Sequence, residues 1–222
     1  IHAAINRNAE EFPLKPMLEV GRFLDPLGYG SMNVYYLGGL GASYLLRWET
    51  GEAMFGQILT SFVVYGLLKV PVEIIVGRTR PYQEQGAYSF GNDDATSFFS
   101  GHTVNVFSLA TVVSHHVDRT WFDVAAYFAA TCVGFQRIEA DAHWPSDVLA
   151  GLALGWTSAW LGLRWGKRFS WGARSLGRQI LAGAAADVFV SANLERMDEL
   201  ERAGLVRQED RVSLLSNRLT VV

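Results

Sequence analysis

The chain has 222 residues, half of which are hydrophobic, and a formal net charge of -3. That length and composition allow a buried hydrophobic core and exclude a mainly disordered chain. No run rich in Lys or Arg provides a basic surface, so nucleic acid is excluded as a leading partner. The single cysteine, Cys132, lies in an apolar run and is expected to pack in the core.

Long apolar segments dominate the first three quarters of the chain, and all of them are predicted to be helices. They are Met32 to Trp48, Ala53 to Gly77, Thr103 to Val117, Trp121 to Gln136 and Val148 to Trp165. Most approach the length of about 17 to 25 residues that spans a bilayer. The sequence therefore predicts an all-α, multi-helix, membrane-type bundle.

Two features of these segments bear on the membrane interpretation. Trp48, Trp121 and Trp165 lie at segment ends, as in the aromatic belt of a membrane protein. Lys69 and Glu73, in contrast, lie inside the second segment, where charges are costly unless they face a site or an interface. A buried helical bundle of a soluble protein therefore stays open as the alternative.

The composition changes near Arg168, where the long apolar runs stop. The later residues show strand-like runs, DVFVSA and NRLTVV, around a stretch with Leu194, Met197 and Leu200 at helical spacing and Gly204 as a C-terminal cap. We expect a helical domain over residues 1–168 and a short C-terminal α/β fragment over residues 169–222.

The loops between the apolar segments hold the candidate chemistry. They contain GRTRP (residues 77–81), SGHT (100–103) and QRIEADAHWPSD (136–147). Arg80 and Arg137 would supply fixed, always charged forks for phosphate oxygens. Ser100 and Gly101 stand at a predicted helix start, where free N–H groups attract anions. These groups, with His102 and His143, predict an anion pocket suited to phosphate.

His143 and Asp147 are four residues apart at the predicted start of the last apolar helix. This spacing puts them on one face, so the carboxylate could hold one ring nitrogen and leave the other as a nucleophile or base. A second histidine could then act as a general acid. Each feature alone also fits a capped helix end or a stabilising ion pair; the combination favours a site.

In this order, GRTRP, SGHT and RIEADAHWPSDVLAG resemble the signature blocks of the type 2 phosphatidic acid phosphatase superfamily, which also includes bacterial acid phosphatases and vanadium haloperoxidases. The resemblance covers about Phe23 to Trp165. It implies that His143 attacks phosphorus, Asp147 orients it and His102 protonates the leaving group. It further implies that Arg80, Arg137, Ser100 and the Gly101 N–H bind the phosphoryl oxygens, without a metal or other cofactor.

Three positions depart from the family pattern. Glu73 stands where the family has lysine, Phe99 replaces the usual proline, and Gln136 replaces a usual serine. A carboxylate at residue 73 would repel phosphate. Lys69 lies one helical turn earlier on the same face, so we expect it to reach the pocket and to pair with Glu73.

The tail, Ser175 to Val222, resembles an internal stretch of periplasmic molybdate-binding proteins of ABC transporters. It corresponds to about a quarter of such a protein and lacks most of the anion-binding loops, so molybdate binding is not expected. A fusion, a truncation or an artefact of gene prediction or assembly would each explain this tail.

The resemblance implies a phosphatase acting on a lipid phosphate or lipid pyrophosphate, or on another phosphomonoester. It also implies contact with membrane lipids, in the bacterial inner membrane with the site facing the periplasm or the cell exterior. Two alternatives stay open: a soluble acid phosphatase or vanadate-dependent haloperoxidase, and a phosphate- or lipid-binding membrane protein that Glu73 has impaired.

Overall fold

The computed structural model describes residues 2–11, 13–92, 95–165 and 194–210, and the chain forms two compact units, Ile1–Phe169 and Ser170–Val222. Every regular element in the described residues is a helix. The α-helices are α1 (His2–Arg7), α2 (Leu14–Leu24), α3 (Met32–Leu45), α4 (Glu49–Val76), α5 (Gly101–Val117), α6 (Thr120–Glu139), α7 (Pro145–Trp165) and α9 (Leu194–Arg202). Short 3-10 helices are η1 (Asp25–Gly28), η2 (Pro81–Gln83) and η3 (Gln208–Asp210).

The predicted apolar helices are confirmed as α3 to α7, and so is the all-α bundle. Their boundaries differ from the prediction by a few residues at the polar ends. Helix α5 begins at Gly101 because Ser100 caps it, and α7 begins at Pro145, a residue that suits the first turn of a helix. The predicted core position of Cys132 is also confirmed, since this residue is fully buried.

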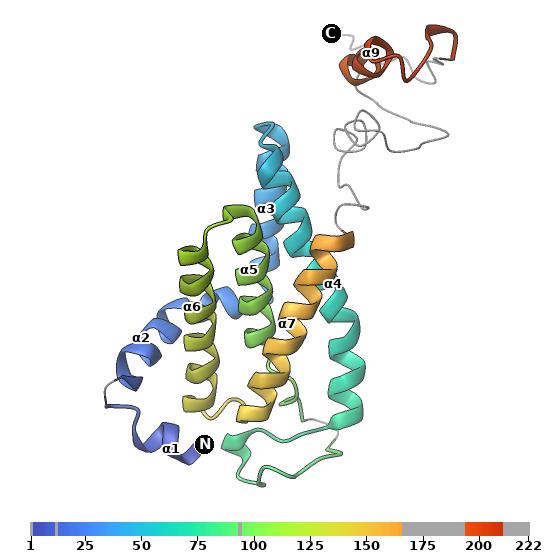
Figure 1. Ribbon diagram of the computed structural model, residues 1–222. Coiled ribbons are helices and arrows are strands. Elements are labelled where there is room, and N and C mark those ends of the chain that lie inside the picture. The colour runs from blue at the N-terminus through green and yellow to red at the C-terminus, as the bar shows by residue number, and fades with distance from the viewer. Residues whose placement is uncertain (1, 12, 93–94, 166–193, 211–222) are drawn as a thin grey trace, which may run out of the picture. The chain divides into compact units, whose positions relative to one another are not determined.

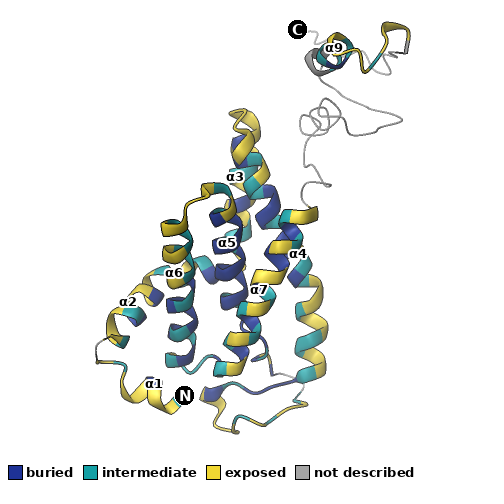
Figure 2. Ribbon diagram, viewed as in Figure 1, coloured by how far each residue is buried: buried dark blue, intermediate teal, exposed yellow. Residues whose placement is uncertain are grey.

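Helix α5 is the centre of the first unit. It runs beside α4, α6 and α7 (Figure 1), and most of its length is buried in Figure 2. Val104 and Val112 on α5 are fully buried and pack in one cluster with Ile58 and Phe62 of α4. This packing fixes the start of α5, and with it the SGHT segment, against its neighbours.

The beginnings of α5 and α7 approach each other closely. A Cβ atom on Gly151 of α7 would lie 2.7 Å from the carbonyl oxygen of Ser100, so only glycine fits this contact. One turn later, the Ser108 hydroxyl donates to the Gly155 carbonyl oxygen at 3.0 Å. This close contact sets His102, on the first turn of α5, near the loop that precedes α7.

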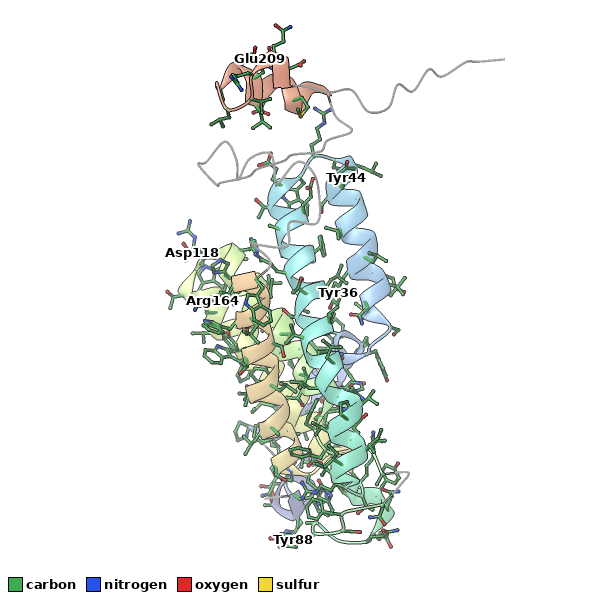
Figure 3. All side chains as sticks on the ribbon, turned by 90° about the vertical axis from the view of Figure 1, so that its right-hand side faces the viewer. Tyr36, Tyr44, Tyr88, Asp118, Arg164 and Glu209 are labelled. Atoms are coloured by element: carbon green, nitrogen blue, oxygen red, sulfur yellow. The ribbon has the colours of Figure 1, made fainter. Side chains whose placement is uncertain are left out.

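Helix α3 packs along the first half of α4, away from these loops. Tyr36 points from α3 toward α4 (Figure 3), and its ring stacks on Phe62 at a centroid distance of 5.5 Å. In the same view, Tyr88 marks the end of the bundle that carries the loop after α4, and Asp118 marks the opposite end. The polar loops with the candidate residues lie at the Tyr88 end (Figure 1).

The second unit is described over residues 194–210 only. The predicted helix is α9, and Gly204 follows it with a φ of +72°, as expected for a C-terminal cap. The N–H of Gly204 donates to the Glu201 carbonyl oxygen at 2.9 Å. The two strand-like runs predicted in the tail lie outside the described residues.

Candidate active site

Four helix ends meet at one end of the bundle: the ends of α4 and α6 and the beginnings of α5 and α7 (Figure 1). Gly77 ends α4 in the left-handed region, with a φ of +49°, and a Cβ there would lie 2.6 Å from the Asn92 nitrogen. Glycine is therefore required for the turn that starts the loop of residues 77–100. This turn directs the loop back over the start of α7.

His143 lies in the loop between α6 and α7 and is only 4% exposed. Its Nδ1 atom is 2.8 Å from the Ser97 carbonyl oxygen. Because a carbonyl oxygen can only accept, Nδ1 carries the proton and Nε2 keeps the lone pair. The geometry therefore leaves Nε2 as the nucleophilic atom of this ring.

The expected direct contact between Asp147 and His143 is not present. The nearest distance, from His143 Nδ1 to Asp147 Oδ2, is 3.9 Å, which is too long for a hydrogen bond. The prediction from the four-residue spacing was therefore wrong in detail. His143 precedes α7 and Asp147 lies in its first turn, and the Ser97 carbonyl oxygen, rather than the carboxylate, accepts the hydrogen bond of the ring.

Asp147 instead holds the loop that orients His143. Its Oδ2 accepts hydrogen bonds from the Ser97 hydroxyl at 2.5 Å and from the Trp144 N–H at 3.0 Å, while Oδ1 pairs with Arg78 Nη1 at 2.5 Å. Arg78 also donates to the Ser146 hydroxyl and to the Ala87 carbonyl oxygen. Asp147 thus acts on the histidine through Ser97.

His143 is electrically neutral at ordinary pH. Burial, followed by the positive charge of Arg80, lowers the pKa of His143 to about 3. A neutral imidazole with its Nδ1 proton held by a carbonyl oxygen can use Nε2 as a nucleophile without first losing a proton.

His102, on the first turn of α5, lies beside a small charged group. Its Nε2 atom is buried, has no hydrogen-bond partner among the described residues, and is 3.9 Å from Asp25 Oδ1. The same Asp25 oxygen is 3.0 Å from Arg137 Nη2. Asp25 of η1 therefore links the second histidine to the arginine at the end of α6.

Ser100 and Gly101 form the start of α5. The Ser100 side chain accepts from the Thr103 N–H at 3.4 Å and the Thr103 hydroxyl at 2.9 Å, so its own hydroxyl proton is available to a ligand. The Ser100 N–H donates to the Asp147 carbonyl oxygen at 3.1 Å. The N–H groups of Gly101 and His102 precede the first backbone bonds within α5, so they could bind an anion, as the sequence predicts.

Arg80 and Arg137 come from opposite sides of this end of the bundle. Their positive charges act on both His102 and His143, which shows that the four residues share one electrostatic environment. Within the part of the chain that the structure describes, the guanidinium of Arg80 makes two long contacts, both 3.4 Å, with Thr96. Arg137 is held more firmly, by Asp25 and by the Gln136 side chain at 2.7 Å.

The expected pair between Lys69 and Glu73 is confirmed. Lys69 Nζ lies 2.6 and 2.7 Å from the two carboxylate oxygens of Glu73. The stem of Lys69 also lies beside the start of α5, because its Cε atom would be 3.6 Å from a Cβ placed on Gly101. The lysine is therefore next to the start of α5, but its charge is balanced by Glu73.

Sequence reasoning missed Asp25, Arg78 and Ser97. Arg78 lies inside GRTRP, so its position in a loop of interest was a usable signal. Asp25 lies 77 residues before His102 in an unremarkable segment, and no pattern links the two. Within the described residues, no group of three or more His, Cys, Asp or Glu side chains could hold a metal ion.

Comparison with known proteins gives similarity to lipid phosphatases. Lipid A 1-phosphatase of Porphyromonas gingivalis is 40% identical over 77 residues, which are 32% of this chain and 17% of that protein. The Rhizobium johnstonii protein of the same name is 31% identical over 166 residues, 67% of this chain and 66% of the relative. That of Rhizobium etli is 35% identical over 104 residues, 44% of each chain. The chain thus spans less than two thirds of the length of each relative.

Solved structures show the same fold at low identity. LpxE of Aquifex aeolicus matches with a TM-score of 0.52 and 24% identity, over 73% of this chain and 92% of that one. A transmembrane PAP2-type phosphatidylglycerolphosphate phosphatase from Bacillus subtilis matches with a TM-score of 0.50 and 22% identity, over 75% and 85%. These matches establish the membrane-type helical bundle as the fold.

Two family models match the chain in succession. A model of bacterial extracellular solute-binding proteins matches residues 170–222 and accounts for a minor part of the chain. The model of the PAP2 superfamily matches residues 54–171, which are more than half of the chain and include the three loop segments around His102 and His143. The chain belongs to the PAP2 superfamily.

Proposed function

We propose that this protein is a phosphatase that hydrolyses a lipid phosphate through a phosphohistidine on His143. One observation carries the proposal: a buried, neutral histidine with its Nε2 lone pair available shares its environment with His102 and with the charges of Arg80 and Arg137. This arrangement supplies a nucleophile, an acid and an anion clamp at a helix start.

In the first step, His143 Nε2 attacks phosphorus, the N–P bond forms and the bond to the leaving oxygen breaks. His102, which takes up a proton when the negative charge of the bound phosphate lies beside it, gives that proton to the leaving oxygen, which departs as an alcohol. Arg80, Arg137, the Ser100 hydroxyl and the Gly101 N–H bind the phosphoryl oxygens, on which negative charge is spread in the transition state. The Ser97 carbonyl oxygen keeps the Nδ1 proton in place while the ring becomes positively charged.

In the second step, water attacks the phosphohistidine. His102, now neutral, takes a proton from that water as the new O–P bond forms, and the N–P bond breaks to restore neutral His143. Inorganic phosphate is the second product. The same two histidines thus serve both halves of the reaction.

The relatives suggest which lipid to test first. Each of the matched relatives is called a lipid A 1-phosphatase, so a lipid A-type glycosyl phosphate is the leading candidate substrate, with phosphatidic acid as a simpler lipid phosphate. A lipid pyrophosphate would place its terminal phosphoryl group in the same clamp. Lys69 would lie at the edge of that clamp.

The surface of the first unit supports the proposed position in the bacterial inner membrane. Among the described residues, one helical stretch, Glu49–Gln83, is long and apolar enough to cross a membrane. Exposed apolar side chains on this stretch and on α7 include Leu67, Ile74, Ile75, Leu149 and Trp156. Lipid would cover these side chains. The proposed orientation puts the site on the periplasmic or exterior side.

The C-terminal fragment has no part in this reaction. In the proposed division, residues 1–168 form the catalytic domain and residues 169–222 form a fragment related to solute-binding proteins of the molybdate type. The match of residues 170–222 to that broad group supports the relationship. All proposed catalytic residues precede Trp165.

The direct test is release of inorganic phosphate by the purified chain in detergent, with lipid A 1-phosphate and phosphatidic acid as separate substrates. The His143→Ala variant is the blank, since it lacks the nucleophile. Release well above the blank supports the proposal. Equal release by the two proteins, or none by either, would overturn it.

A further inference from the structure

An apolar cavity lies next to the proposed active site, between α5 and α6 and under η1. Its volume is about 240 Å³, and every residue that lines it is apolar. It contains none of the proposed catalytic residues. Leu24, the last residue of α2, and Leu27 of η1 form one wall of the cavity. They stand on either side of Asp25, which contacts Arg137 and lies near His102.

On α5, the lining residues continue the face that begins at His102. Val106, Ala110 and Val113 follow it by 4, 8 and 11 residues, the spacing of one helix face. At 1.5 Å per residue, this stripe extends about 16 Å from the histidine. The general acid of the proposed reaction thus stands at the head of an apolar stripe.

Helix α6 repeats this pattern in the opposite direction. Val133, Ala130 and Ala126 precede Arg137 by 4, 7 and 11 residues, so the arginine stands at the head of the matching stripe. Phe122 lines the cavity one turn further on. The two stripes line the same space, and its polar end holds His102 and the Arg137–Asp25 pair.

Small side chains keep this space open. Ala110, Ala126, Ala129 and Ala130 all line the cavity, whereas leucine at such positions would fill it and gain dispersion contacts. A space with a polar, hydrogen-bonding head, made by His102 and the Arg137–Asp25 pair, and a purely apolar body is complementary to an amphiphile that has a phosphate at one end and a hydrocarbon chain at the other.

We propose that this cavity binds an acyl chain of the lipid phosphate substrate. The residues of α5 and α6 that line it would then select lipid phosphates over water-soluble phosphate esters. The proposal rests on the proposed function for its substrate. The chain enters beside Asp25 and extends along the α5 and α6 stripes toward Phe122. Chains long enough to fill the cavity gain apolar burial that short chains cannot gain.

The first test compares substrates. Ala126→Phe would fill the cavity, and Ala125→Phe, one residue earlier on the exposed side of α6, is the matched control. We expect Ala126→Phe to lower kcat/KM for long-chain phosphatidic acid about tenfold or more, while p-nitrophenyl phosphate hydrolysis stays within about twofold. The milder Ala129→Val should show the same selectivity to a smaller degree. Equal loss for both substrates in both cavity variants would contradict the proposal.

The second test needs no turnover and so separates this proposal from the proposed function. A phosphatidic acid with a diazirine at the end of one acyl chain is photolysed with the His143→Ala protein, and the labelled peptides are mapped. We expect labels on the lining segments of α5 and α6, lost in Ala126→Phe and kept in Ala125→Phe.

A neutral diacylglycerol with the same diazirine chain is the comparison for the head group. Weaker labelling of the cavity by this lipid supports a site for phosphate-bearing lipids. Equal labelling would show that any membrane lipid occupies the space, and labels confined to exposed faces would show that no chain enters; both results would overturn the proposal. Cavity labelling without any phosphate release would sink the phosphatase function alone.

Discussion

At the scale of single residues, the site depends on a chain of contacts rather than on one dyad. His143 is held by the Ser97 carbonyl oxygen, Ser97 is held by Asp147, and Asp147 is paired with Arg78. Both members of the Arg78–Asp147 pair are buried. Loss of one partner therefore leaves an uncompensated charge inside the protein.

This arrangement predicts that Arg78→Gln destabilises the protein by about 3–5 kcal/mol and lowers kcat far more than it changes KM, because Arg78 positions the site without touching substrate. Thermal unfolding and steady-state kinetics measure the two effects. Arg164→Gln is the control, since Arg164 lies over the Trp160 ring as Arg78 lies over the Trp144 ring. The account is wrong here if Arg78→Gln and Arg164→Gln behave alike.

The sequence could indicate most of the candidate residues because the loops that carry them have compact patterns. It could not indicate which of these residues contact one another. A four-residue spacing suggested that Asp147 contacts His143, but backbone geometry decides which acceptor reaches the ring, and the Ser97 carbonyl oxygen lies 46 residues earlier. Asp25 could not be predicted because the packing of η1 against α5 brings it to the site.

At the scale of elements, the five apolar helices were predictable because their hydrophobic runs are long, and their boundaries shifted by only a few residues at the polar ends. The closeness of the helices was not predictable. It depends on individual glycines such as Gly151, where a Cβ would lie 2.7 Å from the Ser100 oxygen and 3.0 Å from Thr103 Cβ. The spacing of α5 and α7 sets the distance between the two halves of the site.

We therefore expect Gly151→Ala to lower stability by about 1–3 kcal/mol and to reduce kcat, because α7 must move away from α5. Gly66→Ala in α4 is the matched control, as nothing lies within 4 Å of the added methyl group. That control should be neutral or stabilising by about 0.5–1 kcal/mol. Thermal melts of the two variants decide the point, and similar melting temperatures would contradict the packing argument.

Helix α4 also carries the main departure from the family pattern. Glu73 holds Lys69 through both carboxylate oxygens, next to the start of α5. Glu73→Gln removes the negative charge and frees Lys69 for the phosphoryl group, so kcat/KM for a lipid phosphate should rise about tenfold.

The double variant Glu73→Gln/Lys69→Met tests the source of that gain. It should lose the increase, since the lysine charge is gone. If Glu73→Gln alone leaves kcat/KM unchanged or lowers it, the carboxylate has another role and Lys69 does not assist the reaction.

At the scale of the whole molecule, the direction of α7 has a consequence for topology. The helix begins at the proposed site and ends at Trp165, at the opposite end of the bundle (Figure 1). If the site faces the periplasm, the chain leaves α7 on the cytoplasmic side.

A green fluorescent protein fused directly after Trp165 should therefore fluoresce in cells, since it folds in the cytoplasm. The same protein inserted in the loop near Tyr88, at the site end, should stay dark. Fluorescence of the second fusion with a dark first fusion would reverse the proposed orientation.

The central claim is that His143 carries the phosphoryl group, and the most direct measurement is chemical. The chain is mixed with a ³²P-labelled lipid phosphate, quenched within milliseconds in alkali, digested and mapped. We predict an alkali-stable, acid-labile phosphate on the peptide that contains His143, absent from His143→Ala and longer lived in a His102→Ala variant. Phosphate release without any labelled peptide, or a label that persists in His143→Ala, would contradict the account.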